Sequence, residues 1–309
     1  MIWGIVLRRI LIGAATLLFV SLAIVPGTQV LPGGTAQIRL GQEPAPENVA
    51  ALRARPGLDR PLYEQYFGWL QGFVTGDLGR SLAGDVPVSR MIGDRWFNTV
   101  VVAAWTVAIS VPLSIALGLM AAMWPGSAFD RGLRLFNVAL MATPEFFVAT
   151  ALVATFVIGV GYGSAVVIGS TASKGPVGLL LHVIYPVITL SFITSSQTTR
   201  LTRAALLNVL TAPHVEMARL KGVERRRLVI GPIVNVVAPN LAYLISGVVV
   251  VEVYFSYPGL AVLLVQAVQT RDFIVIQSVG MLFCAADVII ILIADLAAIL
   301  SNPRLRHPK

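Results

Sequence analysis

Charged residues are scarce in this chain of 309 residues, of which only 12% are Asp, Glu, Lys or Arg. An ordinary soluble domain carries about 25%. Apolar residues make up 56% of the chain, and this combination favours an integral membrane protein over a soluble protein with a large core. The net charge is +8, but the basic residues form no stripe interleaved with aromatic side chains, which argues against nucleic-acid binding.

Motifs for catalysis and metal binding are also missing. The chain has no Gly-Lys dipeptide and therefore no phosphate-binding loop of the form G-x-x-x-x-G-K-[ST]. It has no H-E-x-x-H or G-x-S-x-G motif, and His182, His214 and His307 are too scattered for a metal site. The single cysteine, Cys284, cannot form an internal disulfide. These absences argue against a membrane-embedded enzyme, and we expect no ATPase site and no cofactor in this chain.

What the chain has instead is six apolar runs, each long enough to cross a bilayer, which takes roughly 20 residues. They are Arg9–Val25, Asn98–Trp124, Leu133–Val160, Gly178–Ser196, Pro232–Phe255 and Ser278–Leu300. No strand-like alternation recurs, so we expect an all-α integral membrane protein. Arg8 and Arg9 before the first run would suit a cleaved signal peptide, but no small-x-small cleavage site follows and we expect a retained helix. Four prolines fall in or near the runs and are expected to kink them, namely Pro112, Pro144, Pro186 and Pro239.

The apolar runs divide the chain into three parts. Residues 1–27 are expected to form an N-terminal transmembrane helix, residues 28–97 an external segment with an amphipathic helix, and residues 98–309 a five-helix core containing a cytoplasmic loop at 200–230. With the N-terminus inside, the cytoplasmic segments hold 14 of the 23 basic residues, whereas the short outer loops hold only Lys174 and Arg271. Because basic residues stay on the cytoplasmic side, both termini are expected there.

The external segment contains "GLDRPLYEQYFGWLQGFVTGDLGRSL", from Gly57 to Leu82. Asp59 and Pro61 are typical of a helix start, and apolar residues follow at near-helical spacing. These residues are Leu62, Tyr66, Trp69, Leu70 and Phe73. Two interpretations stay open: a helix that lies on the outer membrane face with its aromatic rings at interface depth, or a docking surface for an external partner.

The cytoplasmic loop contains "HVEMARLKGVERRR". Pro213–Lys221 is predicted to be a helix of about nine residues, roughly 14 Å long, with Gly222 at its C-terminal cap. A helix this short is unstable alone in water, so it must pack against something. A positive-inside loop on anionic lipid would explain Arg225–Arg227. It does not explain the capped helix before them.

Ionisable residues inside the runs are functional candidates by default. They are Glu145, His182, Glu252, Asp287 and Asp295. Asp287 lies deepest, and we expect it to face the translocation path or a partner helix. Asp295 is close to the cytoplasmic end and suits an anchor or a contact between helices. The polar run Thr194–Thr202 could line the inner mouth of a pore, although a helix end that returns to water is the favoured interpretation.

Several motifs together resemble one family. Glu216-Met217-Ala218, three further residues and Gly222 are similar to its cytoplasmic signature, E-A-A-x-x-x-G, with Met217 in place of the middle alanine. The other matching stretches are Pro26-Gly27-Thr28, "GLDRPLYEQY", "GDLGRSL", "VVVEVYFSYPGLAVLL" and "NPRLR". In order and spacing they resemble the inner-membrane permease subunits of binding-protein-dependent ABC importers, of the oligopeptide/dipeptide/nickel type, over nearly the whole chain.

This resemblance implies a six-helix, type I permease bundle that forms half of a translocation pathway for peptides or a related small solute. Glu216, Met217, Ala218 and Gly222 would belong to a coupling helix seated on a separate cytoplasmic ATPase. Glu252, in the stretch before Tyr257-Pro258-Gly259, would be a structural or gating residue near the outer mouth.

The implied partners are a second, related permease, giving a heterodimer in the bacterial inner membrane, and a periplasmic solute-binding protein. The alternative is a stand-alone secondary transporter or channel, which would move solute without an ATPase. The absence of an inverted repeat in the sequence lowers the case for a secondary transporter.

Overall fold

The computed structural model describes residues 2–29, 61–161, 183–210, 217 and 225–301. These residues form helices joined by turns, with a single isolated β-bridge, between Arg80 and Pro87, and no named strand among them. The expected all-α class is therefore confirmed for the part of the chain that is described.

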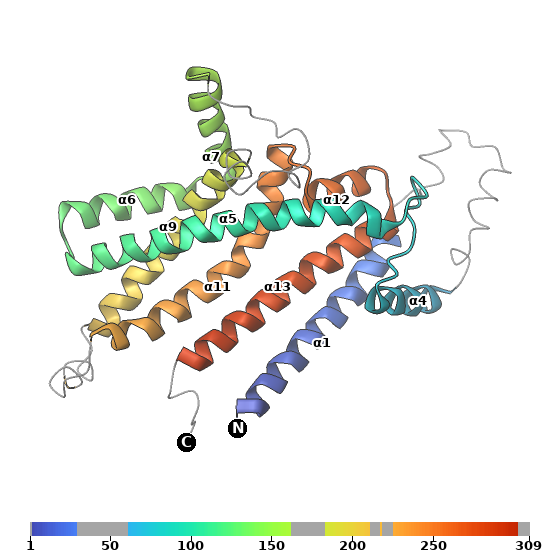
Figure 1. The fold of residues 1–309 in the computed structure, drawn as a ribbon, viewed down its shortest axis with the longest axis horizontal. Coiled ribbons are helices and arrows are strands. Elements are labelled where there is room, and N and C mark those ends of the chain that lie inside the picture. The colour runs from blue at the N-terminus through green and yellow to red at the C-terminus, as the bar shows by residue number, and fades with distance from the viewer. Residues whose placement is uncertain (1, 30–60, 162–182, 211–216, 218–224, 302–309) are drawn as a thin grey trace.

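Long helices lie side by side and make up the bundle (Figure 1). They are α1 (Ile2–Gln29), α5 (Val88–Met123), α9 (Ile184–Leu210), α11 (Arg225–Tyr254) and α13 (Phe273–Ser301). α5 packs mainly on α9, α11 joins α9 to α13, and α1 covers α13. α1 and α13 run antiparallel, because Arg9 pairs with Asp295 at one end and Thr28 accepts a hydrogen bond from Gln277 at the other.

Three helices in the described part are long and apolar enough to cross a membrane: Val6–Thr28 of α1, Val88–Met123 of α5 and Phe273–Ala297 of α13. They coincide with the first, second and sixth runs of the sequence. The fourth and fifth runs fall on α9 and α11, which have 27 and 30 residues and stay predicted spans.

The third run, expected over Leu133–Val160, is not one continuous helix. It consists of α6 (Ala128–Ala142), α7 (Glu145–Leu152) and the π-helix η1 (Val153–Gly159), with a bend of 107° between α6 and the rest. Pro144 explains the break, because it lacks an N–H and forces Thr143 into an extended conformation, with φ −95° and ψ 126°. The kink expected at Pro144 is thus confirmed, and it is sharp.

The predicted boundary between residues 97 and 98 falls inside α5, which begins at Val88 instead of Asn98. Arg90 and Arg95 interrupt the apolar pattern in this first part of the helix. An uncharged apolar run can therefore be recognised only after Arg95, although the helix begins at Val88. The five-helix core consequently extends into what we expected to be the end of the external segment.

The polar run on α9 was interpreted wrongly. Its hydroxyl residues, from Thr194 to Thr202, neither line an open mouth nor meet water: those at 194, 195, 196, 198, 199 and 202 are all buried. Gly118 of α5 lies against them, so closely that an added Cβ would be 2.9 Å from two carbons of Thr202. Small residues thus let α5 and α9 approach closely, which is the usual basis of helix packing in membranes.

Two short helices lie at one end of the bundle (Figure 1). α4 (Leu62–Thr75) follows Pro61 and ends at Gly76, whose φ of 84° makes it a left-handed cap. Tyr66 is buried against α1, where its hydroxyl is 2.8 Å from Ser21 Oγ. α12 (Leu260–Gln269) packs on α5, α11 and α13.

Alanine substitutions at two helical glycines test the α5–α9 contact. Gly132 on α6 has nothing within 4 Å of an added Cβ, so Gly132→Ala should stabilise the protein by about 1 kcal/mol through helix propensity. Gly118→Ala should do the opposite, because overpacking costs about 1–3 kcal/mol. Thermal unfolding of the detergent-solubilised protein measures both. Melting temperatures that move in the same direction would contradict the close contact.

Candidate functional site

The segment with the cytoplasmic signature connects two helices that pack against each other. Glu216, Ala218 and Gly222 lie outside the described residues, whereas Met217 is described, helical and 56% exposed. α9 ends at Leu210 and α11 begins at Arg225, so the signature joins helices that are in contact with each other and belong to the body of the bundle. The predicted helix Pro213–Lys221 stays a prediction.

A buried ion pair lies near this segment, and the sequence analysis did not single it out. Asp130, at the start of α6, is fully buried, and Arg203 on α9 contacts both of its carboxylate oxygens, at 2.5 and 2.8 Å. One of these oxygens also accepts a hydrogen bond of 2.9 Å from the backbone N–H of Gly126. Arg203 was counted only as a topological anchor. An acidic residue next to Arg131, in a turn between two apolar helices, was the available signal.

Glu252 lies at the opposite end of α11 and is also completely buried. Its carboxylate accepts hydrogen bonds from the hydroxyl of Thr99, at 2.6 Å, and from the backbone N–H of Ala261, at 2.8 Å. Gly259 lies directly against it, so closely that a Cβ there would overlap the carboxylate. Glu252 therefore joins α5, α11 and the start of α12.

Two further contacts strengthen this junction. Asn98 donates a hydrogen bond of 2.8 Å to the carbonyl of Pro258, and the hydroxyl of Tyr257 donates one of 3.1 Å to the carbonyl of Asn98. The turn between α11 and α12 is thereby tied to α5. In the stretch "YFSYPGL", Tyr257 and Pro258 are the residues bonded to Asn98, and Gly259 is the residue that lies against Glu252.

Asp272, between α12 and α13, holds the external turn, residues 76–87 between α4 and α5, in a similar way. Its carboxylate accepts hydrogen bonds from the hydroxyl of Ser81 and from the backbone N–H groups of Leu82, at 3.2 Å, and Ala83, at 3.1 Å. Asp272 is 2% exposed. The stretch "GDLGRSL" is therefore bound to the beginning of α13, although 191 residues separate Ser81 from Asp272.

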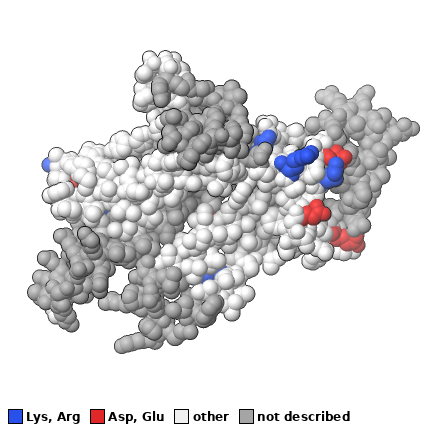
Figure 2. Space-filling model, in the orientation of Figure 1, with Lys and Arg blue, Asp and Glu red and all other residues white. Residues whose placement is uncertain are grey.

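Exposed charge is concentrated at this end of the molecule. Figure 2 shows most of the coloured side chains of that face gathered where Figure 1 places α4 and α12. The exposed charged residues of α4, the external turn and the first turn of α5 are Glu64, Asp77, Arg80, Asp85 and Arg90. Both signs are present, and the patch lies on a scaffold that Glu252 and Asp272 fix in place.

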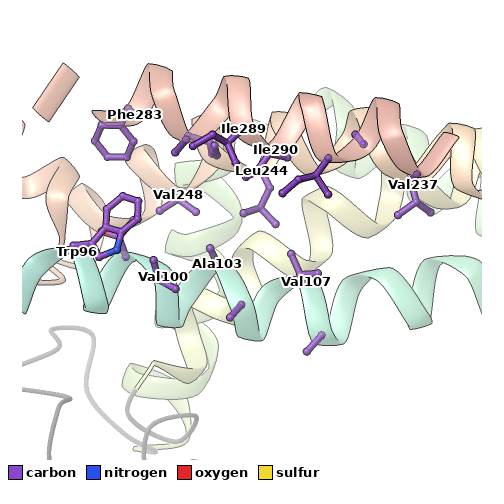
Figure 3. Close-up of a pocket in the computed structure, with 18 of the residues that line it drawn as sticks. Trp96, Val100, Ala103, Val107, Val237, Leu244, Val248, Phe283, Ile289 and Ile290 are labelled. Atoms are coloured by element: carbon purple, nitrogen blue, oxygen red, sulfur yellow. The ribbon is translucent and has the colours of Figure 1, made fainter. Parts of the chain in front are cut away.

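An apolar groove of about 870 Å³ opens between α5, α11 and α13 (Figure 3). Its walls are aliphatic and aromatic over almost their whole length. Among the lining residues are Val100 and Val107 of α5, Leu244 and Val248 of α11, and Phe283 and Ile290 of α13. Thr99 and Trp96, at the outer end, carry the polar atoms nearest to it. A hydrophilic solute would find few hydrogen-bond partners there.

The other predicted carboxylates differ in their surroundings. Asp295 pairs with Arg9 at 2.9 Å, as suits a contact between helices. Asp287 is half-buried on α13, adjacent in sequence to the groove residue Ala286, and has no polar partner among the described residues. The structure does not bring Asp287 and Glu252 together into one site. In the part of the chain that is described, no three His, Cys, Asp or Glu residues are grouped as metal ligands.

Comparison with known families accounts for almost the entire chain. Residues 114–307 match the family described as "Binding-protein-dependent transport system inner membrane component". Residues 2–117 match "Binding-prot-dependent transport system membrane comp, N-term". The two matches overlap within α5 and together cover the bundle and the external segment.

Two relatives extend over the same length. The "Probable peptide ABC transporter permease protein y4tP" of Sinorhizobium fredii is 30% identical over 311 residues, which cover 98% of this chain and 99% of that protein. The "Glutathione transport system permease protein GsiC" of Escherichia coli O6:H1 is 30% identical over 310 residues, 98% of each protein. The chain therefore belongs to the binding-protein-dependent inner membrane components, the permease subunits of ABC importers.

Proposed function

We propose that this chain forms half of the translocation pathway of an ATP-driven importer for peptides or a related small solute. The family match carries the proposal, and the peptide and glutathione transporters among its relatives support the class of solute. The family is one of multi-pass inner-membrane components, which sets aside a stand-alone transporter. ATP would be hydrolysed by a separate subunit, because the chain has no Gly-Lys pair for a phosphate-binding loop.

Coupling to that ATPase is assigned to the segment Glu216–Gly222. The signature of this segment and its place between α9 and α11 support the assignment. A helix seated there on a partner would push on two helices that pack against each other. Both termini, Met217 and the rest of the loop would then lie in the cytoplasm, in line with the distribution of basic residues.

Substitutions in the signature test this assignment. Gly222→Pro would remove the left-handed cap predicted at this position, and Glu216→Lys would reverse the charge in the first turn of the predicted helix. Each should leave membrane insertion intact while lowering ATPase co-purification and ATP-dependent uptake of labelled tripeptides by tenfold or more, a loss of about 1.4 kcal/mol or more in coupling. Insertion, co-purification and uptake are measured separately. Wild-type behaviour in all three would rule out the coupling helix.

The external patch is proposed as the docking surface for a periplasmic solute-binding protein. Because the patch carries charges of both signs, it can fix the orientation and register in which a partner protein binds. Its rigidity comes from Asp272, which holds the turn beneath Arg80 and Asp85. The interpretation of α4 as an interfacial helix remains compatible with this, because Tyr63 and Phe67 are exposed whereas Tyr66 packs on α1.

The same substitution at two aspartates distinguishes a residue that holds the turn in place from a residue that is only exposed on it. Asp272→Ala leaves the backbone N–H groups of Leu82 and Ala83 without their acceptor, so trypsin added from outside should cut after Arg80 faster, and stimulation by the binding protein should fall. Asp85→Ala removes the exposed Arg80–Asp85 pair, which is worth about 0–1 kcal/mol, and leaves Asp272 in place as the acceptor for Leu82 and Ala83. It should change cleavage little. Equal cleavage rates in the two variants would contradict the proposed scaffold.

A helix of the second permease is proposed to occupy the apolar groove between α5, α11 and α13. The groove lies between helices that belong to the membrane part of the chain, and its aliphatic lining suits close packing of another helix rather than passage of a peptide. Asp287, at the border of this groove, would then face the partner helix or the path beside it. Glu252 would keep the outer end closed by holding α12 on α5.

The two carboxylates should respond differently to removal. Glu252→Ala leaves the N–H of Ala261 and the hydroxyl of Thr99 without their acceptor, and leaving a buried donor unpaired costs about 1–3 kcal/mol. It should lower the melting temperature of the isolated chain. Asp287→Leu should leave that temperature unchanged and reduce capture of the second permease or uptake. If Asp287→Leu preserved both assembly and transport, the assigned role of Asp287 would be wrong.

A further inference from the structure

We propose that the buried ion pair of Asp130 and Arg203 is a positioning link that transmits movement of the coupling segment to α5 and α6. The inference rests on the proposed function, because it takes Glu216–Gly222 as the place where the ATPase acts. It adds residues that the signature does not contain. Neither Asp130 nor Arg203 is assigned a role by the family signature or by the relatives' names.

The geometry of the pair is that of a fixed joint. The guanidinium of Arg203 donates two hydrogen bonds to Asp130, from Nε at 2.5 Å and from Nη2 at 2.8 Å. Such a two-point contact fixes the orientation of both groups as well as their distance. The Asp130 side chain has no exposed surface, and that of Arg203 is 19% exposed. Water therefore competes poorly for either partner.

Asp130 also secures the turn that leads out of α5. Its Oδ2 accepts the N–H of Gly126, at 2.9 Å, and its own N–H bonds to the side chain of Ser127, the N-cap of α6. Gly126 has a φ of 78°, a conformation for which glycine is suited. Through one carboxylate, the end of α5, the start of α6 and the side of α9 are held in a single arrangement.

Arg203 occupies a sensitive position along α9. α9 ends at Leu210, which places Arg203 about two helical turns, or roughly 10 Å, before the end of that helix. A displacement applied beyond Leu210 reaches Arg203 through a continuous helix. The ion pair then passes it to α5 and α6. Without the pair, α9 contacts α5 there through closely packed small residues such as Gly118 and Thr202, which form no ion pair.

A second arginine provides the control. Arg134 approaches the same carboxylate at 3.7 Å, but its side chain is 51% exposed, and it belongs to α6, the helix that Asp130 itself begins. It spans no gap between helices. Removing the charge of Arg134 should therefore leave the transmission of movement intact.

The test needs a variant that removes the link without leaving a buried charge. A single Asp130→Asn or Arg203→Met removes one member of the buried pair and leaves the charge of the other without its main partner, which is strongly destabilising. The double variant, Asp130→Asn with Arg203→Met, carries no buried charge. It retains an oxygen for the N–H of Gly126 and the apolar stem at position 203, so it should fold and assemble.

The measurement uses the whole complex in nanodiscs, with ATP as the probe, so that no knowledge of the solute is required. Spin labels at the exposed positions Leu7 on α1 and Arg131 on α6, in a Cys284→Ser background, report the distance between two sides of the bundle. In the wild-type complex and in Arg134→Gln, ATP should change this distance. In the double variant, ATP should still be hydrolysed, and the distance change should be lost.

Each result has a distinct meaning. A double variant that assembles and keeps the wild-type distance change would overturn the proposal. A double variant that fails to assemble would also overturn it, because the pair would then serve folding alone. A wild-type complex that captures no ATPase would contradict the proposed function itself, independently of the ion pair. Loss of the change in the double variant, with Arg134→Gln unaffected, is the result that supports the link.

Discussion

A carboxylate buried in a membrane protein must find its hydrogen-bond donors within the chain, and this requirement organises the whole molecule. Asp130, Glu252 and Asp272 each meet it by contacting a residue far away in the sequence, at separations of 73, 153 and 191 residues. Each joins helices by polar contacts in addition to their apolar packing. Because apolar side chains gain little from contact with one another in lipid, such polar contacts fix which helices are neighbours and where their ends lie.

Between these polar joints, the helices meet through contacts without strong direction. Along the interface of α5 and α9, the buried hydroxyls of Thr106, Ser110, Ser195 and Thr202 have no hydrogen-bond partner. A shift of one helix along the other therefore breaks few specific bonds in the middle of the bundle. The ends of the helices are different, because a helix that moves there also displaces the segments bonded to Asp130, Glu252 or Asp272. This contrast suits a protein whose helices move as connected groups between two states.

The sequence indicates the apolar middle of this fold well and its polar joints poorly. Apolar runs and turn residues predicted α1, α4, α13 and the break at Pro144, because these features depend on neighbours in the chain. The run at Thr194–Thr202 was misjudged, since a serine or threonine can face water, a pore or a close helix, and only the neighbouring Gly118 decides among them. The partners of Asp130 and Asp272 could not be predicted for the same reason. The sequence around a carboxylate does not show which distant residue will donate a hydrogen bond to it.

The same physics makes the groove between α5, α11 and α13 a poor path for a peptide. The groove offers a peptide almost no hydrogen-bond partners, while each unpaired polar group of a peptide would cost at least about 1–3 kcal/mol there. The proposed function therefore assigns the path for a hydrophilic solute to a place where this chain meets another permease surface. If a second permease fills the groove, the path lies beside that contact, and its opening depends on how α5, α6 and α9 move together. The ion pair of Asp130 and Arg203 is the described contact that obliges those three helices to do so.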